Sequence, residues 1–370
     1  MPINQIKVIL ARSPYQVIIN EPTQTMTKVE LRLWNKGETR PTNPTYIMSE
    51  GIASVTQTQT NYNISPFILE YIDKYYPQYY SQNVALADNK EWCIGEYKTY
   101  FSSNTVDNQV IEVVEFCGVN GYSTPEQGMN YDPADPSAFY LMANPDIKVY
   151  WKNNYPNYSV IPFYNFIVRD AGQEYKAEWF DKAEQLINSV TFYDGEDAFF
   201  NYAIPLVYAN STFVIISRKS EGAYYKIETE EICEPLYPVE HIRYVNNYGG
   251  WGYLAFFKAS YNSINVKNSD YALMQKEVNY DQTRGQTKPF NINGNGSMKV
   301  NTGWITEDYF ELIQDVMLSD TIIQEDTGLG YYRPLIIKTS TMQKKTYITD
   351  KNINYTLEFD FANKLINNIV

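Results

Sequence analysis

Hydrophobic and polar side chains alternate along much of this chain with a period of two residues. In the segment INYTLEFDFA, Ile353, Tyr355, Leu357, Phe359 and Phe361 fall on one face, and mostly polar side chains fall on the other. This alternation is typical of a β-strand with one buried face. The same pattern predicts strands in residues 29–34, 94–101, 110–116, 212–217, 225–229, 334–340 and 345–349. Clusters of Asp, Asn, Gly and Pro separate the runs at intervals typical of antiparallel sheets, so we expect a mainly β protein built of sandwiches or barrel-like sheets.

Two other segments have the spacing of short amphipathic helices, and they resemble each other. They cover residues 64–72 and 305–313. Ser65 and Thr306 stand where a hydroxyl oxygen can accept a backbone N–H of the first turn and cap the helix. Pro66 falls at the first helical position, where its missing N–H has no cost.

Apolar residues around these two starts have the spacing of a hydrophobic staple. Ile64 is spaced for contact with Leu69, and Ile305 is spaced for contact with Phe310. The second helix continues one apolar face through Tyr309, Ile313, Val316 and Met317. We favour convergence of two helices on one good start signal. A repeated strand-to-helix module, which would suit a tube-like or ring-like component, is the alternative.

A glycine-rich turn precedes the second helix. Asn293-Gly294-Asn295-Gly296 contains two consecutive Asn-Gly pairs, the strongest short signal for a two-residue hairpin with positive φ. A Gly-x-Gly loop can also bind phosphate, but its glycines must then lie at the helix N-terminus. Here the helix is expected about ten residues later, at Thr306. We therefore predict that Asn295 and Gly296 form a hairpin tip.

Breaks in the pattern favour three consecutive domains. We expect an N-terminal β domain with one helix in residues 1–118 and a Tyr/Trp-rich middle β region in residues 119–237. Residues 238–370 would form a C-terminal α+β domain of β-hairpin, helix and β-strands. The loop of residues 118–138 is rich in Gly, Pro and Asp and is the best candidate linker. A second break lies near residues 233–238.

The composition adds an unusual content of tyrosine, with 35 Tyr in 370 residues. Tyr suits half-buried strands and protein interfaces, although an AT-rich genome would also favour its codons. Candidate interface residues are Trp151, Trp251 and Tyr253, which lie in aromatic-rich segments. The same side chains could stack on sugar rings, but buried strands and subunit contacts use them more often.

The formal net charge of −13 argues against specific nucleic-acid binding, which needs clustered Lys and Arg. No apolar run approaches the roughly 18 residues of a membrane helix, so we expect no membrane insertion. No signal peptide is readable at the N-terminus. Cys93, Cys117 and Cys233 form neither a CxxC pair nor a disulfide framework, and we expect them to be buried apolar side chains.

The sequence offers little for catalysis. His241 is the single histidine, which excludes His-rich metal sites, and its place beside a strand-like run favours a structural role over that of a general base. The motifs GxSxG, GxxxxGK[ST] and HExxH are absent. We expect no catalytic residue, no cofactor and no metal. A pair of carboxylates acting as in glycosidases is not identifiable without distances.

Several stretches of the chain carry a family resemblance. They are SPYQVIIN, VELRLWNKG and NYNISPFILEYI near the N-terminus, and EHIRYVNNYGGWGYLAFF, VNYDQTRGQTKPFN, VNTGWITEDYFELIQDVMLSD and RPLIIKTSTMQKKTYITDKNINYTLEFDFA from residue 240 onward. Together they resemble virion proteins of tailed bacteriophages infecting Bacteroidetes, including crAss-like and flavobacterial phages. The resemblance covers both ends of the chain and contains no catalytic motif. It implies a structural tail or baseplate component and supplies no active-site residues.

These observations lead us to expect a non-enzymatic virion structural protein, made in the bacterial host cytoplasm and placed in the tail as part of a ring, hub or baseplate. Its partners would be copies of itself, in a homo-oligomer, and other phage tail proteins. The first alternative is a receptor- or carbohydrate-binding tail-tip protein that contacts a host-surface glycan. The weakest alternative is a cell-envelope hydrolase.

Overall fold

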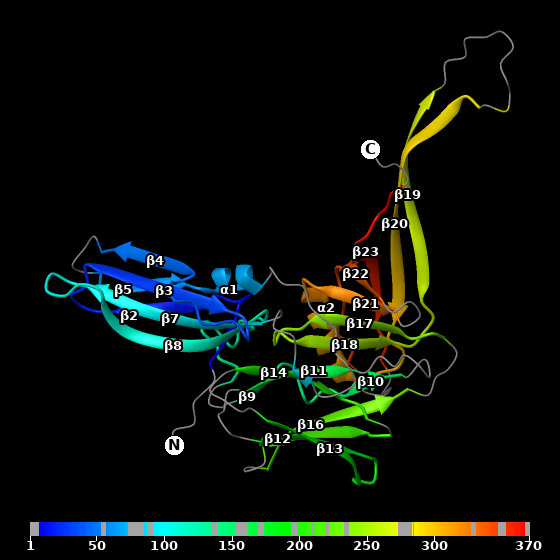
Figure 1. The fold of residues 1–370 in the computed structure, drawn as a ribbon. Helices are drawn as coiled ribbons and strands as arrows, with labels where there is room; N and C mark the ends of the chain where they lie inside the picture. The colour runs from blue at the N-terminus through cyan, green and yellow to red at the C-terminus, as the bar shows by residue number, and fades with distance from the viewer. Residues whose placement is uncertain are drawn as a thin grey trace. The chain divides into compact units, whose positions relative to one another are not determined.

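A computed structural model gives the fold of the chain (Figure 1). It describes residues 7–52, 57–72, 85–86, 92–134, 139–152, 162–168, 174–193, 199–208, 210–218, 222–232, 237–272, 283, 285–326, 331–346 and 353–366. The chain divides into two compact units. The first unit holds residues 1–151, 161–230 and 245–253, and the second holds residues 152–160, 231–244 and 254–370.

The structure is mainly β, as the alternation predicts. The first unit contains three sheets and, in addition, one short pair of strands. Their strands are β1 (Val8–Leu10), β2 (Gln16–Asn20), β3 (Met26–Trp34), β4 (Tyr46–Gly51), β5 (Gln59–Asn63), β6 (Ala85–Leu86), β7 (Trp92–Ser102), β8 (Gln109–Val119), β9 (Phe139–Leu141), β10 (Val149–Trp151), β11 (Phe163–Val168), β12 (Glu174–Phe180), β13 (Leu186–Tyr193), β14 (Phe200–Pro205), β15 (Phe213–Arg218) and β16 (Gly222–Glu231). The sheet orders are β1-β8-β7-β3-β4, β10-β16-β15-β12-β13 and β6-β14-β11-β9, and β2 pairs with β5.

One core of the first unit lies between the β1-β8-β7-β3-β4 sheet and the helix α1 (Ser65–Ile72) with the β2–β5 pair. Alternate residues of β3, namely Val29, Leu31 and Leu33, point into this core and are at most 2% exposed. Ile68 of α1 and Phe116 of β8 meet them there. The inward-facing residues are those that the alternation predicts, and their burial supplies most of the driving force for this layer.

A second core joins the β6-β14-β11-β9 sheet to the β10-β16-β15-β12-β13 sheet through aromatic rings. Phe166 of β11 lies 5.6 Å from Tyr175 of β12 and 6.1 Å from Phe192 of β13, measured between ring centroids. The Trp179 indole N–H donates to the Pro205 carbonyl at 3.0 Å. Aromatic residues fill this space because each buries a large apolar ring, and Trp179 also keeps its N–H hydrogen-bonded. These two sheets form a sandwich, in agreement with the expected fold class.

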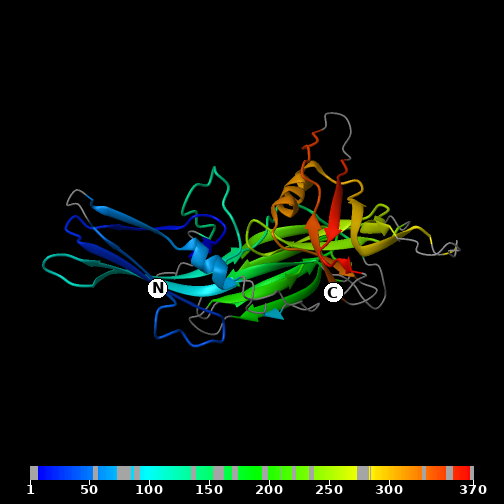
Figure 2. The same cartoon turned by 90° about the horizontal axis from the view of Figure 1, so that it is seen from above.

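The second unit is built around one large sheet. The division between the units falls within β18, after Tyr253. The elements of this sheet and its helices are β17 (Glu240–Val245), β18 (Trp251–Phe256), β19 (Tyr261–Ala272), β20 (Thr287–Asn301), the 3₁₀ helix η2 (Glu307–Tyr309), α2 (Phe310–Leu318), β21 (Ile322–Asp326), β22 (Tyr331–Ile337), β23 (Thr356–Phe361) and β24 (Leu365–Ile366). The sheet order is β18-β17-β21-β22-β23-β20-β19, with β24 also paired to β20. The helix α2 lies beside β23 (Figure 2), and the Phe310 ring is 5.7 Å from the Tyr355 ring.

Most of the predicted strands are confirmed, and so is the buried face of residues 353–361, because Ile353, Tyr355, Leu357 and Phe359 are at most 2% exposed. The predicted strand at residues 345–349 is not formed in its described part, residues 345–346. The three-part division of the chain differs from the two units, the first of which combines most of residues 1–118 and 119–237.

The loop of residues 118–138 is not a linker in its described part. Its backbone and side chains bind the N-terminal strands of the same unit. The Val8 N–H donates to the Asp132 carboxylate at 3.2 Å, and Gln16 exchanges two hydrogen bonds with the side chain of Asn130. A segment rich in Gly, Pro and Asp is therefore used here to follow the irregular edge of a sheet.

The predicted hairpin tip at Asn295 and Gly296 is wrong. Both residues lie inside β20, where Gly296 pairs with Ile264 of β19. The positive φ of this strand occurs instead at Asn291, with φ 50°, where the register shifts and β20 contains an extra residue. A Cβ added to Gly296 would lie 2.9 Å from the Phe361 ring, so this glycine makes room for a side chain of β23 rather than for a turn.

Both predicted helices are present, and Pro66 lies in the first turn of α1. Thr306 does not cap, because no side-chain hydrogen bond forms and the first turn is a 3₁₀ turn. The Ser65 hydroxyl accepts a hydrogen bond from the Tyr15 N–H at 2.9 Å and donates one to the Ser13 carbonyl at 2.6 Å. These bonds hold the start of α1 against the segment just before β2. Ile305 is buried and exchanges backbone hydrogen bonds with Ile353. The predicted apolar face of α2 is confirmed, since Tyr309, Ile313 and Val316 are fully buried.

Candidate interaction surfaces

The most exposed regular element of the chain is an antiparallel two-stranded ribbon in the second unit, formed by β19 and β20 and here called the arm (Figure 1). β19 is the edge strand of its sheet, and all twelve of its residues, Tyr261–Ala272, are exposed. One side of β19 is hydrogen-bonded to β20, so its other side presents backbone N–H and C=O groups for pairing with another strand.

The outer part of the arm is supported by few neighbours. Near its base, β20 pairs on its second side with β23 over residues 297–301 and with β24 over residues 293–294. Beyond that point, residues 287–290 pair with β19, and no other strand of the described residues joins them. A two-stranded ribbon of this kind is only marginally stable in water, and a third strand would stabilise it.

Apolar side chains cover both faces of the arm. Ile264 and Val266 share one face of β19 and are 66% and 55% exposed. Tyr261 is 67% exposed on the other face. Further out, the rings of Tyr271 and Phe290 lie 5.7 Å apart across the two strands, and both remain partly exposed. Large exposed apolar residues concentrated on a long edge strand mark a site of protein association.

The charge of the arm differs from that of the whole chain. Its described strands carry Lys267, Lys288 and Lys299 against one acidic residue, Asp270, whereas the chain as a whole has a net charge of −13. Lys299 is paired with Glu358 at 3.1 Å. The arm therefore presents an apolar edge with positive charge, which favours an acidic partner surface.

Sequence alternation does not reveal the arm. β19 reads YNSINVKNSDYA, in which Asn, Ser and Asp occupy both faces, and only Ile264 and Val266 alternate with polar residues. The strand owes its conformation to pairing with β20, since Asn, Ser and Asp are poor strand formers. The exposure of its apolar residues can be recognised only in the structure.

The candidate interface residues that the sequence suggested lie elsewhere. Trp251 and Tyr253 are 3% and 1% exposed, so the prediction that they form an interface is wrong: strand packing buries them. Trp151, at the end of β10, is half-buried. None of the three supplies an exposed aromatic platform.

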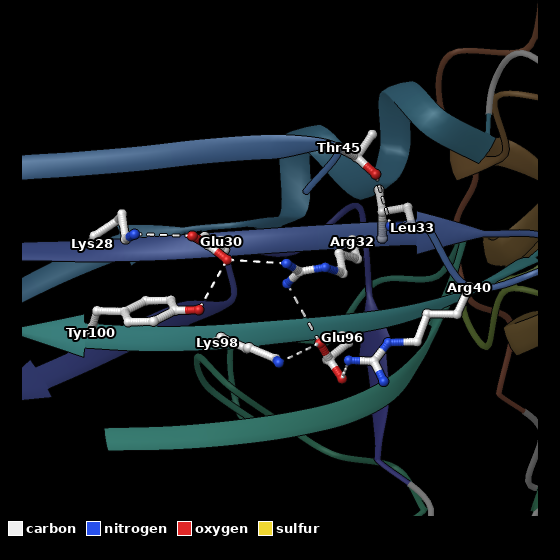
Figure 3. A network of polar contacts seen from close by, with 9 residues as sticks. All are labelled: Lys28, Glu30, Arg32, Leu33, Arg40, Thr45, Glu96, Lys98 and Tyr100. Carbon is white, nitrogen blue, oxygen red and sulfur yellow. Dashed lines mark hydrogen bonds and ion pairs between the residues drawn. The ribbon is translucent and has the colours of Figure 1, made fainter. Parts of the chain in front are cut away.

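A second candidate is a cluster of charged side chains on the β3–β7 face (Figure 3). Glu96 of β7 is 2% exposed and binds three cations: Arg40, Arg32 at 3.6 Å and Lys98 at 3.8 Å. Glu30 of β3 accepts hydrogen bonds at 3.0–3.2 Å from Lys28, Arg32 and Tyr100.

Strand register explains how this cluster assembles. Arg32 is directly opposite Glu96, and Glu30 is opposite Lys98, so the charges alternate across neighbouring strands on one face. Burial raises the pKa of Glu30, but the hydrogen bonds from Lys28 and Tyr100 and the charge of Lys28 outweigh it, and the net pKa lies below its usual value. The cluster binds Arg40 of the 35–45 loop to the sheet and pairs both of its carboxylates with cations, which favours a structural role.

His241 lies in β17 and is 1% exposed, opposite Glu325 of β21. Burial and the nearby Arg243 lower the pKa of its imidazole to about 3. Arg243 is held by Glu325 at 2.7 Å. A neutral imidazole inside a sheet agrees with the structural role that the sequence suggests.

Comparisons with known proteins add no identification. No model of a protein family matches the chain, and no curated protein matches it in sequence. Within the described residues, no group of three His, Cys, Asp or Glu side chains is placed to hold a metal ion, and no helix is long and apolar enough to cross a membrane. Cys93 and Cys117 are buried free thiols, and Cys233 lies outside the described residues.

The charged cluster predicts a large effect of one neutral substitution. We expect Glu96→Gln to lower the free energy of unfolding by about 2 kcal/mol, because it removes a nearly buried carboxylate that pairs with Arg32, whose side chain is itself only 10% exposed. The matched control is Glu358→Gln, which removes a carboxylate that is 40% exposed and paired with Lys299 and Lys338. We expect the control to cost at most about 1 kcal/mol. Urea denaturation measures both, and equal losses would contradict the structural role of the cluster.

His241 predicts a pH dependence of stability. Its folded-state pKa of about 3 lies below the ordinary value of 6.5, so the unfolded chain binds a proton that the folded chain does not. The free energy of unfolding should be unaffected by this group above about pH 6.5 and should fall as pH drops towards 3. In His241→Gln the slope over this range should be smaller by up to about 1.4 kcal/mol per pH unit. Identical slopes in the two proteins, from urea denaturation at several pH values, would show that His241 is not buried as a neutral group.

Proposed function

We propose that this chain is a non-enzymatic structural component of a tailed-bacteriophage virion, placed in the tail as part of a ring, hub or baseplate. Its task is assembly with copies of itself and with neighbouring tail proteins. The observation that carries the proposal is the arm, in which β19 presents twelve exposed residues and an open strand edge. An edge of this length with large apolar side chains is a liability for a protein that stays alone, and it suits one that is covered in an assembly.

Two further features support this reading. The sequence stretches at both ends of the chain resemble phage virion proteins, for which a structural tail role is the expected function. The tyrosines and tryptophans that suit subunit contacts are also used inside the sandwich of the first unit, as Tyr175 and Trp179 show. Synthesis in the bacterial host cytoplasm followed by incorporation into the virion completes the proposal.

The glycan-binding alternative loses its main support. It required an exposed aromatic platform containing Trp151 or Trp251, and Trp251 is 3% exposed. Trp151 is half-buried. No specific feature of the described residues favours sugar binding over protein contact, so we propose no second function.

The proposal predicts that the chain is a stoichiometric part of mature particles. Mass spectrometry of gradient-purified virions should detect it at a constant ratio to the major tail proteins. Gold-labelled antibody against the chain should mark the tail. Its presence only in lysates of infected cells, with none in purified particles, would contradict the proposed function.

A further inference from the structure

We propose that β19 of one copy adds as a new strand to the open edge of β8 in a second copy, so that copies join head to tail through the arm. The inference rests on the proposed assembly function and specifies the partner and the mode of contact. Strand addition supplies backbone hydrogen bonds along the whole contact, and side chains on the two faces determine which edge is chosen.

The β8 edge has the properties that such a contact requires. β8 is paired on one side with β7, and on the other side β1 covers only its last three residues, Cys117–Val119. Among the residues that the structure describes, no strand pairs with β8 before that point. Its first residues are exposed, with Val110 at 48%, Ile111 at 41% and Val113 at 50%.

The β19 edge offers a lysine to the acidic segment of the β8 edge. The segment Gln109–Glu115 contains Glu112 and Glu115 and no basic residue. The β19 edge carries Lys267 and Asp270, and Lys288 lies on the neighbouring strand β20, so Lys267 is the residue of this edge that can meet a carboxylate of β8. Opposite charges across a contact stabilise the correct pairing and penalise competing ones.

One antiparallel alignment places a lysine of β19 opposite a glutamate of β8 beside a pair of apolar residues. If Val266 of β19 lies opposite Val113 of β8, the antiparallel direction places Lys267 opposite Glu112. A parallel alignment with the same Val pair would place Lys267 opposite Val114 instead. Within the described part of the chain, neither Lys267 nor Glu112 has an ion-pair partner, so both charges are available for this contact.

Pairing of β19 with β19 of a second copy is less favourable. The two opposite charges of this strand, Lys267 and Asp270, are three residues apart and therefore lie on opposite faces. Residues that face each other in an antiparallel pair lie on the same face of the sheet, so these two charges cannot meet across a β19–β19 pair. The edge strand β13 carries no charged residue, and β4 carries only Glu50.

The contact uses a different surface on each copy. Contacts of this heterologous type propagate, and they close into a ring when the rotation between copies allows it or continue as a filament when it does not. Either product is a tail-type architecture.

Charge reversal tests the inference on the full-length chain. We expect Lys267→Glu and Glu112→Lys each to weaken self-association about tenfold, as measured by sedimentation velocity over a concentration series. A mixture of the two variant chains should associate as strongly as the wild type, because every arm then meets an edge of opposite charge. The matched controls are Lys344→Glu and Glu126→Lys, which make the same charge changes at exposed residues outside the two edges and should leave association unchanged.

Circular dichroism melting of each variant checks that the fold is retained. Self-association that is unaffected by Glu112→Lys, or that is reduced by Lys267→Glu without recovery in the mixture, would overturn the pairing of β19 with β8. A strictly monomeric wild-type chain would overturn it as well. None of these three results would remove the chain from purified virions, which is the measurement that tests the proposed function, so the two failures are distinguishable.

Discussion

Every β-strand must find partners for its backbone N–H and C=O groups, and this requirement organises the whole chain. The interior strands meet it on both sides, as β7 does between β3 and β8 and as β23 does between β20 and β22. Edge strands meet it on one side only, and water satisfies the other side. Most edge strands of the described sheets are short. β19 is long, is exposed at every residue and carries large apolar side chains.

The sequence predicts the interior strands well because their buried faces impose alternation. In β3 and β23 a polar residue on the inner face would lose its hydrogen bonds to water unless the protein replaces them, as Tyr62 and Thr60 do for Thr27, so most inner residues are apolar. β19 has no buried face in the described structure, and nothing imposes alternation on it. Its role as a strand and its exposure therefore depend on pairing with β20, which a single sequence does not display.

The Asn-Gly pairs also show that a local sequence signal does not always predict the structure. Gly294 and Gly296 have the sequence signature of a tight turn, yet each lies in an extended strand beside a neighbouring side chain, Leu365 for the first and Phe361 for the second. Local propensity favoured a turn, whereas close packing of the Phe361 ring of β23 leaves no room for a side chain at Gly296. The hydroxyl of Thr306 does not cap α2. The chain enters α2 through a 3₁₀ turn, in which the Tyr309 N–H donates to the backbone carbonyl of Thr306.

The charged side chains are distributed unevenly among the strands. On the β3–β7 face, Glu30 and Glu96 both pair with Arg32. The first part of β8 carries acidic residues such as Glu112, and β19 of the arm carries Lys267. The most direct measurement of the central claim is hydrogen–deuterium exchange of the wild-type chain at a dilute and at an associating concentration. Association should slow exchange in residues 261–272 and 109–116 together, because both edges become paired. Exchange in these two segments that stays equally fast in the associated state would contradict assembly through the strand edges.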